Sequence, residues 1–152
     1  MKKPFIFTGW LLGTLFLFTL TAHSHCQIPC GIYNDEARFA MLNEHVATIE
    51  KSINEILRLS SEDQKNFNQI VRWIDNKDEH ANKITDIACD YFLAQRLPLE
   101  PEKDGSYSKK LTLLHQMIVY SMKLKQTTDL DFVKKIKQTI ADFHDAYFIK
   151  DE

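Results

Sequence analysis

The residues best suited to chemistry lie close together, at His25, Cys26 and Cys30. The cysteines supply thiolates and the histidine supplies an imidazole, which are donors that bind soft and borderline metal ions. They belong to the run His-Cys-Gln-Ile-Pro-Cys, in which Pro29 restricts the turn that brings Cys30 back toward Cys26. This run predicts either a metal site or a disulfide.

The segment ahead of this run has the pattern of a cleavable export signal. Its positive start is Lys2-Lys3, and an apolar run follows at about residues 5–20. Small residues stand at the two positions that signal peptidase reads, Ala22 and Ser24. A retained anchor is the alternative, although the apolar run is shorter than the roughly 20 residues of a spanning helix. We predict that signal peptidase removes residues 1–24 and that the mature chain, residues 25–152, works in the periplasm or outside the cell, free of the membrane.

Cleavage after Ser24 gives His25 a free α-amine, whose ordinary pKa of about 8 lets a metal displace its proton. Cys26 then offers its backbone nitrogen as well as its thiolate. The ligand set is an amine, an amidate and two thiolates, with the imidazole as a fifth ligand. Planar nitrogen and sulfur donors suit nickel(II) or copper(II), whereas zinc prefers a tetrahedron.

The Cys-x-x-x-Cys spacing taken alone also fits another class of protein. In an exported chain, Cys26 and Cys30 would by default form a disulfide or carry copper between partners. The alternative is therefore a non-catalytic exported helical bundle.

The nine residues from His25 to Tyr33, His-Cys-Gln-Ile-Pro-Cys-Gly-Ile-Tyr, closely resemble the nickel hook of nickel superoxide dismutases, which reads His-Cys-x-x-Pro-Cys-Gly-x-Tyr at the mature N-terminus. Asp90-Tyr91-Phe92 resembles a family segment that places a second tyrosine near the metal. The resemblance implies an enzyme that converts superoxide to dioxygen and hydrogen peroxide, with one nickel ion per subunit cycling between its +2 and +3 states. It also implies a homo-oligomer, the hexamer that the family forms.

The resemblance assigns roles to individual residues. His25 would bind nickel through its amine and, in the oxidised state, its imidazole. Cys26 would bind through its backbone nitrogen and thiolate, and Cys30 through its thiolate. Tyr33 and Tyr91 would approach the open face of the metal, order a water or the incoming anion, and control access.

Two departures from the family pattern stand out. Gln27 replaces an acidic residue of many members, in a position that does not bind the metal. The family also orients the axial imidazole through a carboxylate early in the first helix and an arginine in the second, where this chain has Ala40-Met41 and Asn76-Lys77. Glu44 is a candidate replacement for the carboxylate.

Hydrophobic periodicity predicts the elements that hold these residues. Apolar residues recur three or four positions apart in four stretches, and no stretch shows the alternation of a strand. We predict an all-α fold, an antiparallel four-helix bundle over about residues 35–150 preceded by an irregular hook at residues 25–34. The four stripes are Leu42, Val46, Ile49, Ile53 and Ile56; Phe67, Ile70, Ile74, Ala81, Ile84, Ala88 and Tyr91; Leu111, Leu114, Ile118 and Met122; and Val133, Ile136, Ile140, Phe143 and Tyr147.

Helix ends are predicted from capping residues. Ser61-x-x-Gln64 has the form of a capping box for the second helix, and the polar stretch 75–79 predicts a kink within it. A loop rich in proline and glycine, 98–105, precedes Ser106 as a cap of the third helix. Thr128 or Asp129 caps the fourth.

Composition excludes several other functions. A net charge of −2 with mixed signs provides no basic surface for nucleic acid. Three cysteines are too few for a disulfide scaffold, and Cys89 is predicted to be a buried, inert thiol. The remaining histidines in the helical region share no metal-ligand spacing.

Overall fold

The computed structural model describes residues 27, 29–97, 99 and 106–148. The chain divides into two compact units, Met1–Cys30 and Gly31–Glu152, and the helices belong to the second. The predicted signal, residues 1–24, lies outside the described residues, as do His25 and Cys26.

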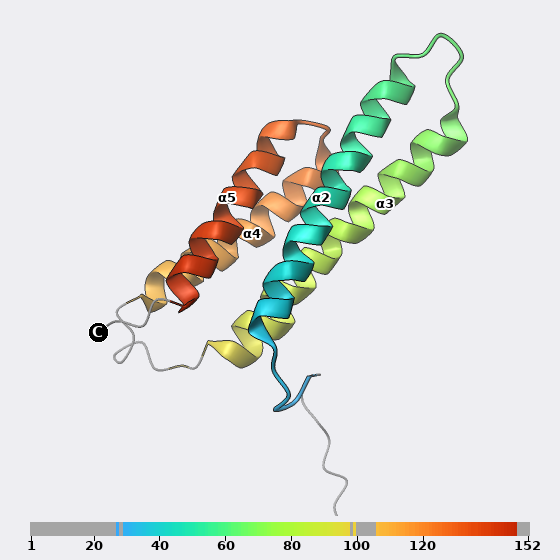
Figure 1. Ribbon diagram of the computed structural model, residues 1–152. Helices are drawn as coiled ribbons and strands as arrows, with labels where there is room; N and C mark the ends of the chain where they lie inside the picture. The colour runs from blue at the N-terminus through green and yellow to red at the C-terminus, as the bar shows by residue number, and fades with distance from the viewer. Residues whose placement is uncertain (1–26, 28, 98, 100–105, 149–152) are drawn as a thin grey trace, which may run out of the picture. The chain divides into compact units, whose positions relative to one another are not determined.

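Helices account for all the regular structure in the part of the chain that the structure describes, as predicted (Figure 1). No strand occurs in that part. The helices are α2 (Asp35–Ser60), α3 (Phe67–Asp86), α4 (Tyr107–Gln126) and α5 (Leu130–Phe148), and a π-helix, η1 (Ile87–Arg96), continues directly from α3.

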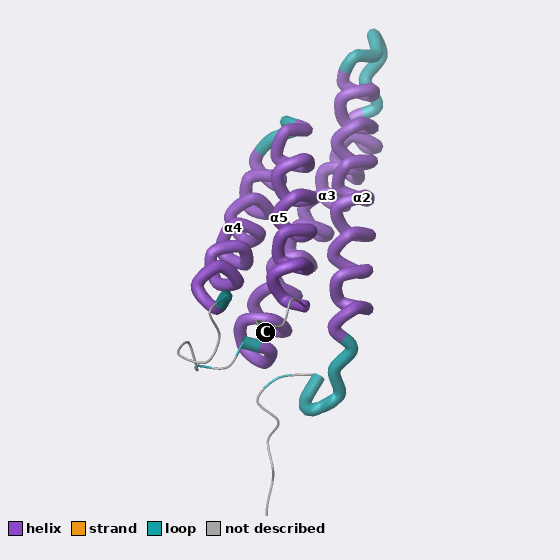
Figure 2. The backbone as a smooth tube through the Cα atoms, turned by 60° about the vertical axis from the view of Figure 1, so that its left-hand side comes forward, coloured by secondary structure: helices purple, strands orange, loops and turns teal. Residues whose placement is uncertain are grey.

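The helices of the second unit pack side by side. α2 lies against α3 and α5, and α4 lies against the same two neighbours. Consecutive helices run in opposite directions, as Figures 1 and 2 show. The second unit is therefore a helical bundle, held by the apolar faces of its helices.

The core confirms two of the predicted stripes and corrects the others. All five residues of the first stripe are buried, and so are Val133, Ile136, Ile140 and Phe143 of the fourth. In the second stripe the prediction is wrong for Phe67, which is 69% exposed, and for Ile74. In the third, Met122 is exposed, because α4 turns the face around Leu114 and Met117 toward the core.

The starts of α3 and α5 depend on side-chain caps, and the cap predicted for the second helix was wrong. The Asn66 side chain accepts a hydrogen bond from the Gln69 backbone at 3.2 Å, so α3 begins at Phe67. Ser61 instead closes α2, where its hydroxyl donates to the Arg58 carbonyl at 2.7 Å. Asp129 caps α5, as predicted, by accepting from the Asp131 backbone at 2.9 Å.

The second helix has no break at residues 75–79, where a kink was predicted. Its irregularity lies further on, in the wider turns of η1, and it ends as the Leu97 backbone donates to the Phe92 carbonyl at 2.9 Å. π-Turns are rare and are frequently found at functional sites. η1 carries Tyr91 and Arg96.

Among the described residues, none of the helices combines the length and apolar character that crossing a membrane requires.

Candidate functional site

Cys30 is the one predicted metal ligand that the described residues include. It is exposed and its thiol is free, so a metal ion has access to it. His25 and Cys26 lie outside the described residues. Within the described part, no three histidine, cysteine, aspartate or glutamate side chains gather to hold a metal. The chemistry of the donors is therefore what indicates the metal: thiolate, amine and amidate donors fit nickel(II).

Gly31 follows Cys30 with a backbone φ of 76°. This left-handed conformation is open to glycine and strained for most other residues. A Cβ atom added to Gly31 would meet no atom within 4 Å, so the backbone angle, and not crowding, explains the glycine.

The structure brings the two predicted tyrosines together. The rings of Tyr33 and Tyr91 have centroids 5.9 Å apart and meet edge to face at 77°. Tyr33 is 39% exposed, whereas Tyr91 is 3% exposed. Tyr33 thus forms the solvent side of the pair and Tyr91 forms its buried support.

A single carboxylate, Asp35, anchors this pair. Its Oδ1 accepts hydrogen bonds from the Tyr91 hydroxyl at 2.5 Å and from Arg96 Nε at 2.9 Å. Its Oδ2 accepts from Arg96 Nη2 at 2.6 Å and from the Tyr147 hydroxyl at 2.9 Å. Asp35 begins α2, Tyr91 and Arg96 belong to η1, and Tyr147 is near the end of α5, so the carboxylate joins three elements.

The hydrogen bonds set the ionisation of the group. Burial alone would raise the pKa of Asp35, but hydrogen bonds from Arg96, Tyr91 and Tyr147 outweigh it, and the pKa is lowered. Burial, and then the bond to Asp35, raises the pKa of Tyr91 and that of Tyr147. The bond to Asp35 raises the pKa of Arg96. At neutral pH the cluster holds a carboxylate, a guanidinium and two neutral phenols.

Two guanidinium groups cover the tyrosine rings. The Arg96 guanidinium carbon lies 4.5 Å from the centroid of the Tyr33 ring, and that of Arg38 lies 4.9 Å from the Tyr91 ring. These are cation–π distances. The Tyr33 hydroxyl donates to Gln95 Oε1 at 3.5 Å, a long and weak bond.

Sequence reasoning missed Asp35, Arg96 and Tyr147. Asp35 has the position of an ordinary first-turn acid, and Tyr147 belongs to an apolar stripe. These three side chains come into contact only when α2, η1 and α5 pack together and the chain adopts the π-helical turns of η1. No spacing rule predicts such a contact from the sequence. The nearest signal is that Asp35 and Arg96 follow closely after the two predicted tyrosines.

Asn76 and Lys77, which stand where the resemblance led us to expect an arginine, have other contacts here. Asn76 donates to the Ser52 hydroxyl at 2.9 Å. Lys77 is buried and donates to the carbonyls of Leu124 and Lys125 at the end of α4. Glu44 is exposed, and its charge acts on His45 and His80. His25 lies outside the described residues, so the structure gives no distance between its imidazole and Glu44.

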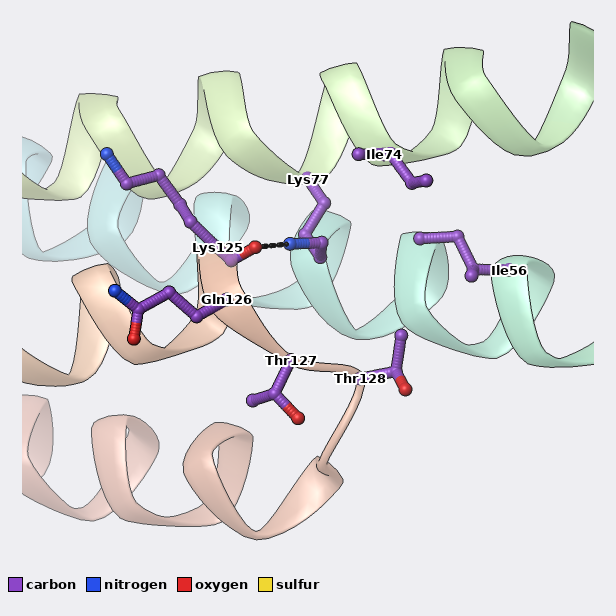
Figure 3. Close-up of a pocket in the computed structure, with 7 residues that line it drawn as sticks. All are labelled: Ile56, Ile74, Lys77, Lys125, Gln126, Thr127 and Thr128. Carbon is purple, nitrogen blue, oxygen red and sulfur yellow. Dashed lines mark hydrogen bonds between the residues drawn. The ribbon is translucent and has the colours of Figure 1, made fainter.

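A pocket of about 410 Å³ lies where α4 ends and α5 begins, beside Lys77 (Figure 3). The Lys77 ammonium points to the Lys125 carbonyl and not into open space. Tyr147, near the other end of α5, contacts the tyrosine cluster. The pocket therefore belongs to the opposite end of the bundle from Tyr33 and Tyr91.

Cys89 precedes the Asp90-Tyr91-Phe92 segment and is half-buried with a free thiol. Burial raises its pKa, and the charges of Asp90 and Asp86 raise it further. A thiol held in its protonated form is a poor nucleophile and ligand, which favours the predicted inert role.

Comparison with known proteins assigns a family. The family model described as nickel-containing superoxide dismutase matches residues 20–150, which include the hook, Tyr33 and Tyr91, and every helix among the described residues. No curated protein and no solved structure matches the chain at a significant level.

Proposed function

The chain belongs to the nickel-containing superoxide dismutase family, and from this premise we propose which of its residues carry the reaction. The family is one of nickel-dependent oxidoreductases, so the chain disproportionates superoxide to dioxygen and hydrogen peroxide. The observation that carries the assignment is the match over residues 20–150 together with the nine-residue hook within it.

His25, Cys26 and Cys30 are the proposed nickel ligands. His25 contributes its α-amine and imidazole, Cys26 its backbone nitrogen and thiolate, and Cys30 its thiolate. Bound there, nickel would supply the one-electron redox couple that the disproportionation of superoxide requires. The exposed Cys30 thiol and the turn at Gly31 support this proposal.

Tyr33 and Tyr91 are the proposed access residues. Superoxide is small, so an opening bounded by aromatic rings admits it while slowing larger reductants. Edge-to-face packing on the buried Tyr91 limits the motion of Tyr33. Thiolates beside superoxide and peroxide are at risk of oxidation, so tight nickel ligation together with control of access by the tyrosines would protect them.

The free amine requires removal of the signal, and we propose cleavage after Ser24 during export to the periplasm or the cell exterior. The support is the charged, apolar and small-residue pattern of residues 1–24. N-terminal sequencing of the protein from fractionated cells tests this proposal. A mature chain that retains Ser24 would contradict it.

We propose that the protein forms a homo-oligomer, and specifically the family hexamer. Its support is an apolar surface on α3, where Phe67, Val71 and Ile74 are exposed on one helical face. Phe67→Asp should lower the mass measured by light scattering, whereas the exposed neighbour Asn68→Asp should leave it unchanged. Equal masses for both variants would place the interface elsewhere.

The main experiment measures superoxide dismutation by nickel-loaded protein that begins at His25, beside the same chain with Ser24 retained. Activity only in the His25 form supports the amine ligand, and equal activity in both refutes it. Cys26→Ser and Cys30→Ser should abolish nickel redox activity, whereas Cys89→Ser is the matched control and should keep it. If no form is active with nickel but the thiols bind copper, the carrier alternative replaces this proposal.

A further inference from the structure

Asp35 has more partners than an acidic residue in the first turn of a helix requires. An anion there is stabilised by the helix dipole alone. Here four hydrogen bonds from Tyr91, Arg96 and Tyr147 converge on its two oxygens. Its side chain is 17% exposed, and that of Arg96 is 29% exposed.

We propose that Asp35, held by Arg96, is a positioning residue of the enzyme: it accepts the hydrogen bond of the Tyr91 phenol, so that Tyr91 has no proton to donate to a molecule at the opening and Tyr33 is the phenol that can donate there. The inference rests on the proposed role of Tyr33 and Tyr91 as access residues.

The hydrogen-bonding capacity of the Tyr91 phenol determines whether it can donate to another molecule. A phenol has one proton to donate and lone pairs to accept with. The Tyr91 proton is directed to Asp35 Oδ1 at 2.5 Å, the length of a strong charge-assisted bond. Tyr147 directs its proton to Oδ2 in the same way. Neither phenol can therefore donate to superoxide or peroxide while Asp35 remains ionised.

Tyr33 differs from Tyr91 in this respect. Its hydroxyl bond to Gln95 Oε1, at 3.5 Å, is weak, and the residue is 39% exposed. Of the three phenols Tyr33, Tyr91 and Tyr147, Tyr33 is the one whose proton is available to a water or an anion. The two access tyrosines thus have distinct roles: the Tyr33 phenol can donate a hydrogen bond at the opening, whereas the Tyr91 phenol donates to Asp35.

Arg96 couples the two tyrosines. It binds Asp35 through two nitrogens, and its guanidinium lies over the Tyr33 ring. Within the described part of the chain, the charged and titratable groups that face Tyr91 are Asp35 and Arg38 from α2, Arg96 from η1 and Tyr33 ahead of α2. Tyr147 from α5 acts on Tyr91 through Asp35. Removing the Asp35 charge should therefore change the titration of Tyr91 and the orientation of both rings.

The test compares Asp35→Asn with Glu36→Gln, a matched loss of one charge at the adjacent exposed carboxylate. Tyrosine carrying ¹³C at Cζ reports the phenol titration by NMR in the metal-free chain. In Asp35→Asn the pKa of Tyr91 should fall, because the phenolate no longer faces a carboxylate. In Glu36→Gln it should stay unchanged. An unchanged Tyr91 titration in Asp35→Asn would overturn the proposal.

Kinetics distinguish a positioning role from a purely structural one. In Asp35→Asn, kcat/KM should fall about tenfold. Its alkaline limit should move to lower pH together with the Tyr91 titration, because a Tyr91 phenolate repels the superoxide anion. An alkaline limit that does not follow Tyr91 would refute the role in the reaction. If Asp35→Asn does not fold, Arg96→Lys replaces it, because it keeps the positive charge and loses the two-nitrogen hydrogen bonding to Asp35. In that variant kcat/KM should fall while the nickel content stays the same, and an unchanged kcat/KM would overturn the proposal.

The experiment separates this inference from the proposed function. Nickel content of Asp35→Asn should equal that of the unaltered protein, because Asp35 is not a proposed ligand. An inactive His25 form of the unaltered chain would reject the proposed function. The Tyr91 titration, which needs no nickel, would still decide whether Asp35 fixes the phenol.

Discussion

His45 on α2 and His80 on α3 face one another with their Nδ1 atoms 3.1 Å apart. The rings meet edge to face at 77°, and His45 is 8% exposed. Two Nδ1 atoms at this distance form a hydrogen bond only if one carries a proton and the other does not. The contact therefore requires at least one neutral imidazole.

This relationship predicts loss of stability in acid. Burial lowers the pKa of both histidines, and the charge of Lys83 lowers both further, although Glu44 opposes it. The unfolded chain then binds more protons than the native one below a pH of about 6.5, so stability is complete above that pH and declines as pH falls through the native pKa values. The slope should reach at most about 1.4 kcal/mol per pH unit for each proton taken up.

Urea unfolding at pH 7.5 and pH 5 measures this loss. His80→Gln should reduce the difference between the two pH values, because it removes one of the coupled groups. His115→Gln, at an exposed position of α4, is the control and should leave the difference as it is. The same pH dependence in all three proteins would show that the pair does not cause it.

Lys77→Met should destabilise the bundle without weakening nickel binding. The Lys77 side chain is 3% exposed, and its ammonium donates to the carbonyls of Leu124 at 2.6 Å and Lys125 at 2.8 Å and to Asp78 at 2.8 Å. The last carbonyls of a helix lack partners within it, and a cation there also favours the helix dipole. In Lys77→Met the Leu124 and Lys125 carbonyls lose this partner, which should cost about 2–4 kcal/mol of unfolding free energy.

Denaturation followed by circular dichroism measures this cost. Lys125→Met is the comparison, because its ammonium forms an exposed bond to Asn82 at 2.8 Å. That variant should lose at most about 1 kcal/mol. Equal losses in the two variants would mean that Lys77 does not stabilise the end of α4.

Asp129→Ala should lower the unfolding free energy by about 1 kcal/mol, since it removes the cap of α5. Thr128→Ala tests the other residue that the sequence offered as a cap, and it should change stability by less than about 0.5 kcal/mol. The same unfolding measurement compares both. A larger loss for Thr128→Ala would reverse the assignment.

How far the sequence predicts the fold depends on what each helix packs against. Leu42 and Ile49 on α2 and Ile136 and Ile140 on α5 are buried, as the helical period predicts. Phe67 satisfies the same period and yet is exposed, because the hairpin of α2 and α3 extends beyond the end of α4 and α5 (Figures 1 and 2). Periodicity identifies an apolar face, but not whether a neighbour covers it.

In the candidate site, too, the sequence predicts some residues and not the neighbours that they contact. Residue types and spacing are enough to single out Cys30 and, through the family resemblance, Tyr33 and Tyr91. The partners of Tyr91 are Asp35 and Arg96, which approach only after α2 and η1 pack and after the π-helical turn sets the direction of η1. Contacts of this kind depend on tertiary packing and carry no local pattern that a sequence reading can use.

The final prediction concerns the turn after the hook. Gly31 has a φ of 76°, and a Cβ atom there would meet nothing within 4 Å, so Gly31→Ala adds backbone strain without a clash. Strain of about 1 kcal/mol corresponds to roughly a fivefold change in an equilibrium constant. Because the proposed ligand Cys30 directly precedes this turn, we expect the cost to fall on metal affinity. Gly31→Ala should therefore weaken nickel binding about fivefold while the unfolding midpoint of the metal-free bundle, whose first described helix begins at Asp35, stays the same. Gly31→Asn should lose less, since asparagine adopts positive φ more readily than alanine. Nickel titration of the three proteins decides: equal affinities would mean that the turn at Gly31 is not required for metal binding.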